Sequence, residues 1–455
     1  MTYFSVVCGR NVIVPIDKDL SAVEVVQLLK DSECRAMVYS QTYSDIIDDL
    51  RGMGMDEVEF ISTKTIPALI EEGRQLSKDK CAAYLNLAIL PNDLASIVYT
   101  SGTTGKSKGV MLSHGNLATD AYASCCAVQV VGPSVLALPL HHAFGLVAGV
   151  FAAMLYGLPV YINKSLKNLL DDFQKCRPRH LLVVPLIAEM LHKNIWAAAR
   201  KQGKEKALKI LVKVSDALLN VGIDLRRMLF KSVLSAFGGE LDLIVSGGAP
   251  LDEKYVVAFR SFGITLLNGY GITECGPVVA VNRNKFNVVG SVGIPICSNE
   301  VKIDEDGEVL VKGDNVMLGY YHDQKSNDEA FVDGWFCTGD LGFLDEQGAL
   351  HISGRKKNLI ILSNGENISA EWLESQIYTI PCVKEAIVYG WNDVITAEVF
   401  LDEDVPDVGE QIYADIQKVN QRLPQIKNIG KVVVRDTEFP KTTTKKIKRN
   451  HGGVQ

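Results

Sequence analysis

The feature that most constrains the fold of this 455-residue chain is a short apolar segment that runs directly into a loop of glycine and hydroxyl residues. Leu94 to Val98 is typical of a buried strand, and residues 99–109 continue as Tyr-Thr-Ser-Gly-Thr-Thr-Gly-Lys-Ser-Lys-Gly. Glycines let successive backbone N–H groups point at one anion, and hydroxyl and ammonium groups add donors. The segment therefore predicts a triphosphate-binding loop. The expected phosphate contacts are Thr100, Ser101, Gly102, Thr103, Thr104, Gly105, Lys106 and Lys108.

The loop has two other possible interpretations. A Walker A loop shares the tail Gly-Lys-Ser at residues 105–107, but Thr100 stands where that motif requires its first glycine. A polar surface turn is the other alternative, although turns rarely hold so many adjacent hydroxyls behind a buried strand. The loop is therefore interpreted as a phosphate site of a different kind.

Two later segments supply groups suited to a carboxylic acid and a flat ring. Residues 138–145 read Leu-Pro-Leu-His-His-Ala-Phe-Gly, although a histidine pair by itself is more often a satisfied core feature than a site. Residues 246–250, Ser-Gly-Gly-Ala-Pro, end a predicted strand in small residues that an adenine or an acyl chain could approach closely. That second signal is weak alone. The expected contacts in it are Gly247, Gly248 and Ala249.

Residues 268–274, Asn-Gly-Tyr-Gly-Ile-Thr-Glu, combine an aromatic face for a base, a hydroxyl for phosphate and a carboxylate for Mg²⁺. Two of their glycines could open a dinucleotide fingerprint, but Glu274 stands where the third glycine belongs, and a carboxylate there would repel a bare pyrophosphate. A bound metal ion removes that objection. The expected nucleotide contacts are Asn268, Gly269, Tyr270 and Gly271, with Thr273 and Glu274 catalytic and Glu274 the metal ligand.

Three segments in the C-terminal part carry charged side chains. Residues 334–340, Gly-Trp-Phe-Cys-Thr-Gly-Asp, end in an aspartate that alone could equally cap a turn. Residues 354–358 read Gly-Arg-Lys-Lys-Asn. Five basic residues fall within the nine from Lys441 to Arg449, and such a run is usually a solvated tail or a nucleic-acid patch.

In their order and spacing, these segments resemble the signatures of the adenylate-forming enzymes, the superfamily of acyl-CoA synthetases, peptide-synthetase adenylation domains and luciferases. The resemblance extends over nearly the whole chain. It implies that His142 lies beside the acyl carboxylate and the aromatic wall of the acyl pocket. It also implies that Asp340 accepts hydrogen bonds from both ribose hydroxyls, and that Arg355 reaches the ribose or a phosphate.

The same resemblance implies a hinge at Lys357 and a catalytic lysine at Lys446. Two departures from the family pattern are mild: Ser107 stands where proline is usual, and Lys445 replaces a frequent glycine. The Lys-Thr-Thr-Thr-Lys-Lys tail and residues 362–368, which include the expected cofactor contact Gly365, are most similar to the long-chain fatty acyl members.

Membership of that group implies an AMP-forming carboxylate:CoA ligase that uses ATP, Mg²⁺ and CoA. A fatty carboxylate attacks the α-phosphorus to give acyl-adenylate and pyrophosphate, and the CoA thiol then displaces AMP. Three alternatives stay open. An enzyme that loads an acyl carrier protein would share every motif, a non-catalytic paralogue could keep them, and residues 441–449 could bind nucleic acid.

Composition favours a cytoplasmic enzyme with no nucleic-acid partner. The chain has 47 Lys and Arg against 54 Asp and Glu, a net charge of −7, which disfavours duplex binding. Its 10 cysteines show no CxxC spacing, as expected in a reducing compartment. A hydrophobic content of 47% over this length can fill more than one core.

The apolar region from Val128 to Asn163 is predicted to be a buried core helix. Prolines, a histidine pair and a Gly-Leu-Pro turn leave about 14 uninterrupted apolar residues, whereas a membrane-spanning helix needs ~20. No signal peptide is expected at the N-terminus. The lysine-rich residues 200–213 predict an exposed helix face, so membrane contact is at most peripheral.

The fold class expected is α/β. Helical and short strand-like segments alternate from residue 11 to 281, for example at 12–16, 36–39, 181–184 and 243–245, which predicts parallel sheets covered by helices. Short runs punctuated by Gly and Asp predict a small antiparallel barrel at about 282–350. We expect a large domain over 1–354 and a mobile α+β lid over 355–455, with a helix that Ser369 caps.

The resemblance also indicates that the first subdomain is shortened. Relatives carry a further stretch before the segment that matches residues 9–15, of roughly 70 to 90 residues at ordinary element lengths. We expect such a chain to be less soluble and lower melting than a longer form, because an uncovered parallel strand leaves apolar surface and backbone groups exposed.

Overall fold

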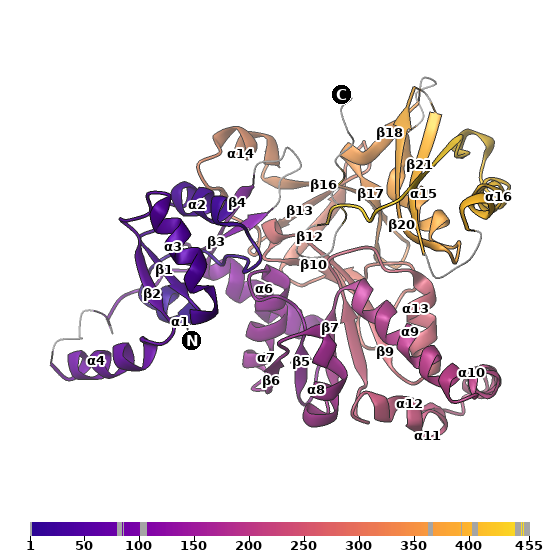
Figure 1. Ribbon diagram of the computed structural model, residues 1–455, viewed down its shortest axis with the longest axis horizontal. Coiled ribbons are helices and arrows are strands. Elements are labelled where there is room, and N and C mark those ends of the chain that lie inside the picture. Colours follow the sequence, from indigo (N-terminus) through magenta and orange to yellow (C-terminus); the bar gives the residue numbers. More distant parts are fainter. Residues whose placement is uncertain are drawn as a thin grey trace.

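The computed structural model describes residues 2–79, 84, 86–100, 107–362, 367–392, 394–402, 408–441, 447 and 449. Within these residues the strands form six sheets, and helices cover the largest of them (Figure 1). The expected α/β class is confirmed, with helices and strands alternating along the large N-terminal part.

A seven-stranded sheet forms the centre of the molecule, in the order β11-β10-β9-β8-β7-β5-β6. The strands from β6 to β9 run parallel, and β10 and β11 are antiparallel additions at one edge. The expected strands at 181–184 and 243–245 are confirmed as β7 and β8. In chain order the strands are β5 (Ser134–Leu136), β6 (Val160–Ile162), β7 (His180–Val183), β8 (Leu243–Ser246), β9 (Thr265–Gly271), β10 (Val278–Val281) and β11 (Ile294–Pro295).

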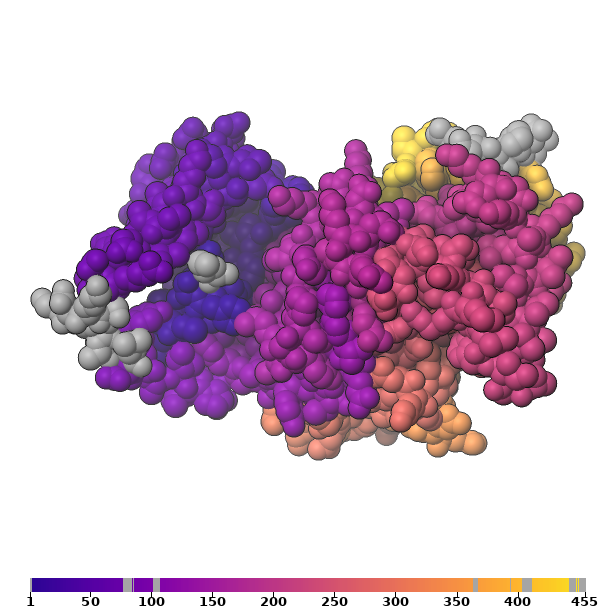
Figure 2. Space-filling view, turned by 90° about the horizontal axis from the view of Figure 1, so that it is seen from below, coloured from indigo at the N-terminus to yellow at the C-terminus, as the bar shows by residue number. Residues whose placement is uncertain are grey.

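Alternate residues of these parallel strands pack into two different cores. Leu181 and Val183 face a core shared with α8 (Leu169–Cys176), α9 (Pro185–Lys201), α12 (Lys231–Ala236) and α13 (Glu253–Ser261). Leu182 and Val245 face the other core, with α6 (His114–Ala127) and the π-helical segment η2 (Phe144–Phe151). This alternation follows from the two-residue period of a strand. In Figure 2 the magenta and pink residues of this part cover much of one face, beside the indigo N-terminal part.

The predicted buried helix in the region 128–163 is confirmed. It consists of η2 followed without a break by α7 (Ala152–Leu155). Among the described residues, no helix is both long and apolar enough to cross a membrane.

The N-terminal part contains a parallel pair, β1 (Ala36–Tyr39) and β2 (Glu59–Ser62), with its own small core. The expected strand at 36–39 is confirmed, but the one at 12–16 is wrong: Ile13 forms only an isolated bridge to Ser96. Pro15 has no N–H to give to a ladder, so the pairing stops there. The helices of this part are α1 (Thr2–Val7), α2 (Ala22–Asp31), η1 (Gln41–Tyr43), α3 (Ser44–Gly52) and α4 (Ile66–Asp79).

The strand expected over 94–98 is confirmed as part of β3 (Leu94–Thr100). It pairs antiparallel with β4 (Lys108–Ser113), which pairs in turn with β14 (Gly319–Tyr320). Because Thr100 lies opposite Lys108, the hairpin brings together the two ends of the predicted phosphate loop.

The antiparallel region expected near 282–350 is a five-stranded sheet shaped as a half-barrel. Its short alternating strands bury one face, as the sequence pattern predicts. The elements are β12 (Asn299–Ile303), β13 (Glu308–Gly313), α14 (Gln324–Ala330), β15 (Phe331–Val332), β16 (Trp335–Leu344) and β17 (Leu350–Arg355).

The C-terminal part forms a separate core of its own, between two helices and the sheet β20-β21-β22. Helix α15 (Ala370–Ile377) begins after Ser369, whose side chain accepts a hydrogen bond from the N–H of Trp372, so the expected cap is confirmed. The other elements are η5 (Lys356–Asn358), β18 (Leu359–Ile361), β19 (Asn367–Ser369), β20 (Val383–Trp391), β21 (Val394–Leu401), α16 (Val408–Asn420), η6 (Gln425–Lys427) and β22 (Lys431–Arg435).

The basic stretch 200–213 is divided between two helices rather than lying on one. Helix α9 ends at Lys201, Gly203 has a positive φ of 67°, and α10 (Glu205–Asn220) begins after it. A residue with a positive φ cannot continue a right-handed helix, which explains the break. The helices α10 and α11 (Arg226–Leu229) follow in chain order.

Candidate active site

An apolar cavity of about 100 Å³ lies where β8 and β9 end and η2 passes over them. Its wall brings together the predicted segments 138–145, 246–250 and 268–274, which are far apart in the sequence. The sequence-predicted residues that line it are Gly247, Gly248, Gly269, Tyr270 and Gly271. Ala249 follows Gly248 in the same turn.

The glycines keep this cavity open and close to the backbone. A Cβ on Gly247 would lie 3.3 Å from the ring of Phe144, and a Cβ on Gly271 would lie 2.1 Å from the carbonyl oxygen of Pro277. Gly248 has a φ of 83°, in the left-handed region that favours glycine. Larger residues at these positions would fill or distort the space into which a flat ring fits.

Two buried polar atoms at this place lack a partner among the described residues. They are the hydroxyl of Ser246, which lines the cavity, and Oδ1 of Asn268, the residue paired with Ser246 in the sheet. The amide nitrogen of Asn268 donates to the carbonyl of Ser291 at 3.2 Å. Because buried polar atoms are normally hydrogen-bonded, the site fits a ligand that is partly apolar and partly polar, such as an adenine ring with its acyl group.

Asp340 lies beside this cavity and is held by two partners. The hydroxyl of Tyr270 donates to Oδ2 at 2.6 Å, and Nε of Arg355 lies 2.8 Å from Oδ1. The side chain of Asp340 is only 4% exposed, yet it carries a charge-assisted pair. Burial, and then the carboxylate, raise the pKa of Tyr270 well above its usual value, so that hydroxyl stays a donor.

A second polar group surrounds Glu274, in the turn η4 (Thr273–Cys275). The hydroxyl of Tyr320 donates to Oε1 of Glu274 at 3.0 Å, and Nζ of Lys108 lies 4.8 Å from the centre of the Tyr320 ring. Burial, and then Glu274, raise the pKa of Tyr320. Lys108 and Glu274, which the sequence assigns to phosphate and Mg²⁺, are thus joined through one tyrosine.

Several predicted site residues lie outside the described residues. They are Ser101, Gly102, Thr103, Thr104, Gly105, Lys106, Gly365 and Lys446. Thr100 and Lys108 flank the first six, and the hydroxyl of Thr100 donates to the carbonyl of Lys108 at 3.5 Å.

His142 lies two residues before η2 and does not line the cavity, to which Phe144 contributes. The rings of His141 and His142 are 4.3 Å apart, and Nε2 of His141 lies 3.5 Å from Oδ2 of Asp17. Burial lowers the pKa of His141. A role for His142 beside the acyl carboxylate stays a prediction.

The predicted hinge residue Lys357 lies in η5, between the half-barrel sheet and the C-terminal part. Burial, and then Arg355, lower the pKa of Lys357 to about 8. Its neighbour Lys356 pairs with Asp306 at 3.2 Å and with Glu308 at 3.0 Å, which ties the start of the C-terminal part to the half-barrel.

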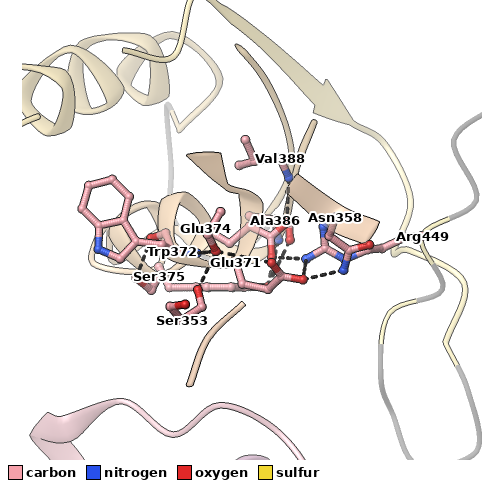
Figure 3. Close-up of polar contacts among 11 residues, drawn as sticks. Ser353, Asn358, Glu371, Trp372, Glu374, Ser375, Ala386, Val388 and Arg449 are labelled. Carbon is pink, nitrogen blue, oxygen red and sulfur yellow. Dashed lines mark hydrogen bonds and ion pairs between the residues drawn. The ribbon is translucent and has the colours of Figure 1, made fainter. Parts of the chain in front are cut away.

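In the C-terminal part, Arg449 is held against helix α15 by two carboxylates (Figure 3). Its Nη2 lies 2.5 Å from Oε2 of Glu374 and 3.5 Å from Oε1 of Glu371, which also accepts from Asn358. The other oxygen of Glu374 accepts from the N–H of Val388 at 2.8 Å. Burial raises the pKa of Glu374 to about 7, although Arg449 acts against that shift.

Lys441, the first residue of the same basic run, is also held by carboxylates. Lys441 pairs with Glu385 and with Glu438, and it forms an isolated antiparallel bridge with Ile447. Lys441 and Arg449, two residues of the basic run, are therefore paired with buried carboxylates. Such pairing argues against a free nucleic-acid-binding surface here.

Sequence reasoning missed three residues of this region: Tyr320, His180 and Glu374. Tyr320 comes from β14, and His180 begins β7 and lines the cavity. No local motif marks them, because each acquires its neighbours through strand pairing or helix packing. For His180, the strand alternation with Leu182 was the one available signal.

Comparisons with known proteins agree with this geometry. The AMP-binding enzyme family matches residues 1–321, and the AMP-binding enzyme C-terminal domain matches residues 357–452. A long-chain-fatty-acid–CoA ligase of Mycobacterium bovis is 30% identical, over 98% of this chain and 82% of its own. A 2-succinylbenzoate–CoA ligase of Listeria monocytogenes is 27% identical, over 96% and 82%.

Solved structures show the same fold. The o-succinylbenzoate CoA synthetase of Bacillus subtilis in complex with its acyl-adenylate intermediate has a TM-score of 0.73 and 25% identity, covering 100% of this chain and 86% of that one. The same enzyme in complex with ATP and magnesium ion has a TM-score of 0.71 and 25% identity, over 97% and 83%.

Proposed function

This chain belongs to the AMP-binding enzymes of the adenylate-forming superfamily, and we propose that it is an AMP-forming fatty acid:CoA ligase. The observation that carries the proposal is the apolar cavity lined by glycines and Tyr270, whose hydroxyl donates to the buried carboxylate of Asp340. The relatives named above include ligases for fatty acids and for an aromatic acid, so the fatty substrate is our inference.

Substrate binding divides between the apolar cavity and its polar surroundings. The acyl chain lies in the cavity, where its burial contributes ~0.8 kcal/mol per methylene. The adenine stacks against Tyr270, and Asp340, which pairs with Arg355 at 2.8 Å, accepts hydrogen bonds from the ribose. Positioning both substrates beside each other supplies much of the rate enhancement.

The chemistry of the first step is charge neutralisation, since a carboxylate must approach a triphosphate. Lys108 and the loop after Thr100 hold phosphate oxygens, and Lys446 donates to the α-phosphate region as negative charge builds up. Mg²⁺, when bound at Glu274, screens the phosphates and the leaving pyrophosphate. Tyr320 fixes the orientation of Glu274 by its hydrogen bond of 3.0 Å. No protein nucleophile is required.

The second step needs a thiol at the same carbonyl carbon. Rotation of the C-terminal part about Lys357 withdraws Lys446 and admits the pantetheine arm of CoA, which attacks and releases AMP. Nine described cysteines carry free thiols, which suits an enzyme of the cytoplasm.

The experiment that tests this proposal is a pyrophosphate-release screen over fatty and aromatic carboxylic acids, with and without CoA. We expect fatty acids to release pyrophosphate, and CoA to be consumed with AMP formation. A strict preference for aromatic acids would overturn the fatty substrate. Turnover with an acyl carrier protein but not with CoA would identify the alternative ligase, and no turnover with any acid would favour a non-catalytic paralogue.

A further inference from the structure

A histidine is shared between two neighbouring cavities. His180 and Val130 line the apolar cavity, and both also line a second cavity of about 210 Å³. The second cavity has polar walls that include Arg179, Asp242 and Asn284. His180 therefore stands between an apolar compartment and a polar one.

The strand register sets the separation between His180 and Gly247, which both line the apolar cavity. His180 on β7 is paired with Leu243 on β8, which is paired with Thr265 on β9. Gly247 lies four positions beyond Leu243, directly after β8 ends. At 3.2–3.4 Å per residue the separation is about 13 Å, which matches the length of an extended hydrocarbon of roughly ten carbons with C–C bonds of about 1.5 Å.

The orientation of the His180 ring is fixed. Its Nδ1 lies 3.4 Å from the carbonyl oxygen of Val131, so the N–H is on Nδ1 and donates to that carbonyl. The side chain is 3% exposed, and burial lowers its pKa, which keeps the imidazole neutral. A neutral, hydrogen-bonded ring is compatible with an apolar wall and presents a rigid surface to the end of an acyl chain.

The walls beyond His180 do not suit a hydrocarbon. Asp242 accepts from Arg179 and lies 2.9 Å from a guanidinium nitrogen of Arg227, and the amide of Asn284 donates to the carbonyl of Gln129. An acyl tail that entered this second cavity would place its methylenes against charged and hydrogen-bonded groups. It would therefore gain less binding free energy there than in the apolar cavity.

We propose that His180 determines acyl-chain length by closing the pocket, so that the preferred substrates are fatty acids of roughly ten carbons or fewer. This inference rests on the proposed function, and it narrows the long-chain expectation from the sequence to medium-length chains. Longer acids must displace the His180 ring or bend within the cavity.

The test compares specificity constants for adenylation across saturated acids of roughly six to eighteen carbons. We expect the wild-type constant to fall beyond about ten carbons. The variant His180→Ala joins the two cavities and should raise the ratio of the constants for a fourteen-carbon and an eight-carbon acid by about ten-fold, since each methylene buried in apolar surroundings contributes about four-fold and the polar walls reduce this. His180→Asn, which can still donate to Val131, should shift the ratio in the same direction by less.

Two further variants separate a length limit from a structural role. His180→Phe keeps the pocket closed and should leave the ratio within about three-fold of wild type, because no new space opens. Adding Thr265→Phe to His180→Ala refills the second cavity and should restore the wild-type ratio. A merely structural histidine would lower activity for all lengths alike.

The outcomes for the two proposals differ. Unchanged length ratios in His180→Ala and His180→Asn, with fatty acids still used, would overturn the role of His180 alone. A wild-type preference for acids of sixteen carbons or more would overturn it as well. If no fatty acid supports pyrophosphate release in the wild type, the proposed function itself fails.

Discussion

The large N-terminal part and the C-terminal part build their sites in opposite ways. The first surrounds its cavity with glycines and apolar side chains, several of them on strands of the seven-stranded sheet, and holds the buried Asp340 against Tyr270 of the cavity wall. In the second, Lys441 and Arg449, two described residues of the basic run 441–449, form ion pairs with Glu385 and Glu374. Under the proposed function, the N-terminal part forms the binding sites for both substrates, whereas Lys446, which would act in only one of the two steps, belongs to the C-terminal part.

The largest effect should come from the predicted lysine of the C-terminal part. Lys446→Ala removes a charged donor that acts in the adenylation transition state, so acyl-AMP formation should fall by about two orders of magnitude or more. Thioester formation from supplied acyl-AMP should largely survive. Single-turnover rates of the two half-reactions check this, with Lys445→Ala as the matched control. An equal loss in both steps would count against the assignment.

The next effect concerns nucleotide binding by the large N-terminal part. Asp340→Ala removes the proposed acceptor for the ribose hydroxyls and leaves Arg355 unpaired, so ATP affinity should weaken by about 2 to 3 kcal/mol. Tyr270→Phe is the control, because it keeps the ring and the carboxylate and should cost less. An ATP affinity that is unchanged in Asp340→Ala would show that Asp340 has only a structural role.

A smaller effect should appear in the pH dependence of the C-terminal part. Because the folded pKa of Glu374 is raised from 4.5 to about 7, the folded part binds this proton more tightly than the unfolded chain does. Its stabilising effect is present at low pH and is lost as the pH rises from 4.5 through about 7. We expect the free energy of unfolding to fall by about 1 to 2 kcal/mol over that pH range. The full pKa shift would correspond to ~3 kcal/mol, and solvent screening reduces it.

Hydrogen exchange of residues in the core of the C-terminal part measures that dependence. In Glu374→Gln, which cannot ionise, the decline in the free energy of opening across this pH range should disappear, while the exposed Glu300→Gln should leave it unchanged. A decline that persists in Glu374→Gln would assign it to other groups.

The smallest effect concerns the tyrosine that orients the predicted metal ligand. Tyr320→Phe removes one hydrogen bond to Glu274 and keeps the ring beneath Lys108, so the KM for Mg²⁺ should rise about five-fold, equivalent to ~1 kcal/mol. Tyr321→Phe, whose ring stacks on His322, is the matched control. An unchanged KM for Mg²⁺ would mean that Tyr320 does not orient Glu274.

Sequence reasoning worked where function depends on local order along the chain. The cap at Ser369 predicted the start of α15, because capping chemistry is local. The motif around Tyr270 was predicted to contact the nucleotide, which stays a prediction, and three of its residues line the cavity. The prediction of a strand at residues 12–16 was wrong. This segment pairs with β3 only through the single bridge between Ile13 and Ser96.

What the sequence could not supply are pairings between distant elements. The contact between Tyr270 and Asp340 joins residues 70 positions apart, and that between Arg449 and Glu374 joins residues 75 apart. The position of His180 in the cavity wall follows from the pairing of β7 with β8, which the sequence does not specify. Such pairings depend on how sheets and helices pack, which composition and periodicity do not specify.

The measurement that tests the division between binding and catalysis most directly is an ATP titration of Lys446→Ala. If the large N-terminal part alone forms the nucleotide site, the Kd for ATP should stay within about three-fold of wild type, because Lys446 acts mainly in the transition state. A loss of ATP affinity as large as that of Asp340→Ala would show that both parts build the binding site and would contradict the account.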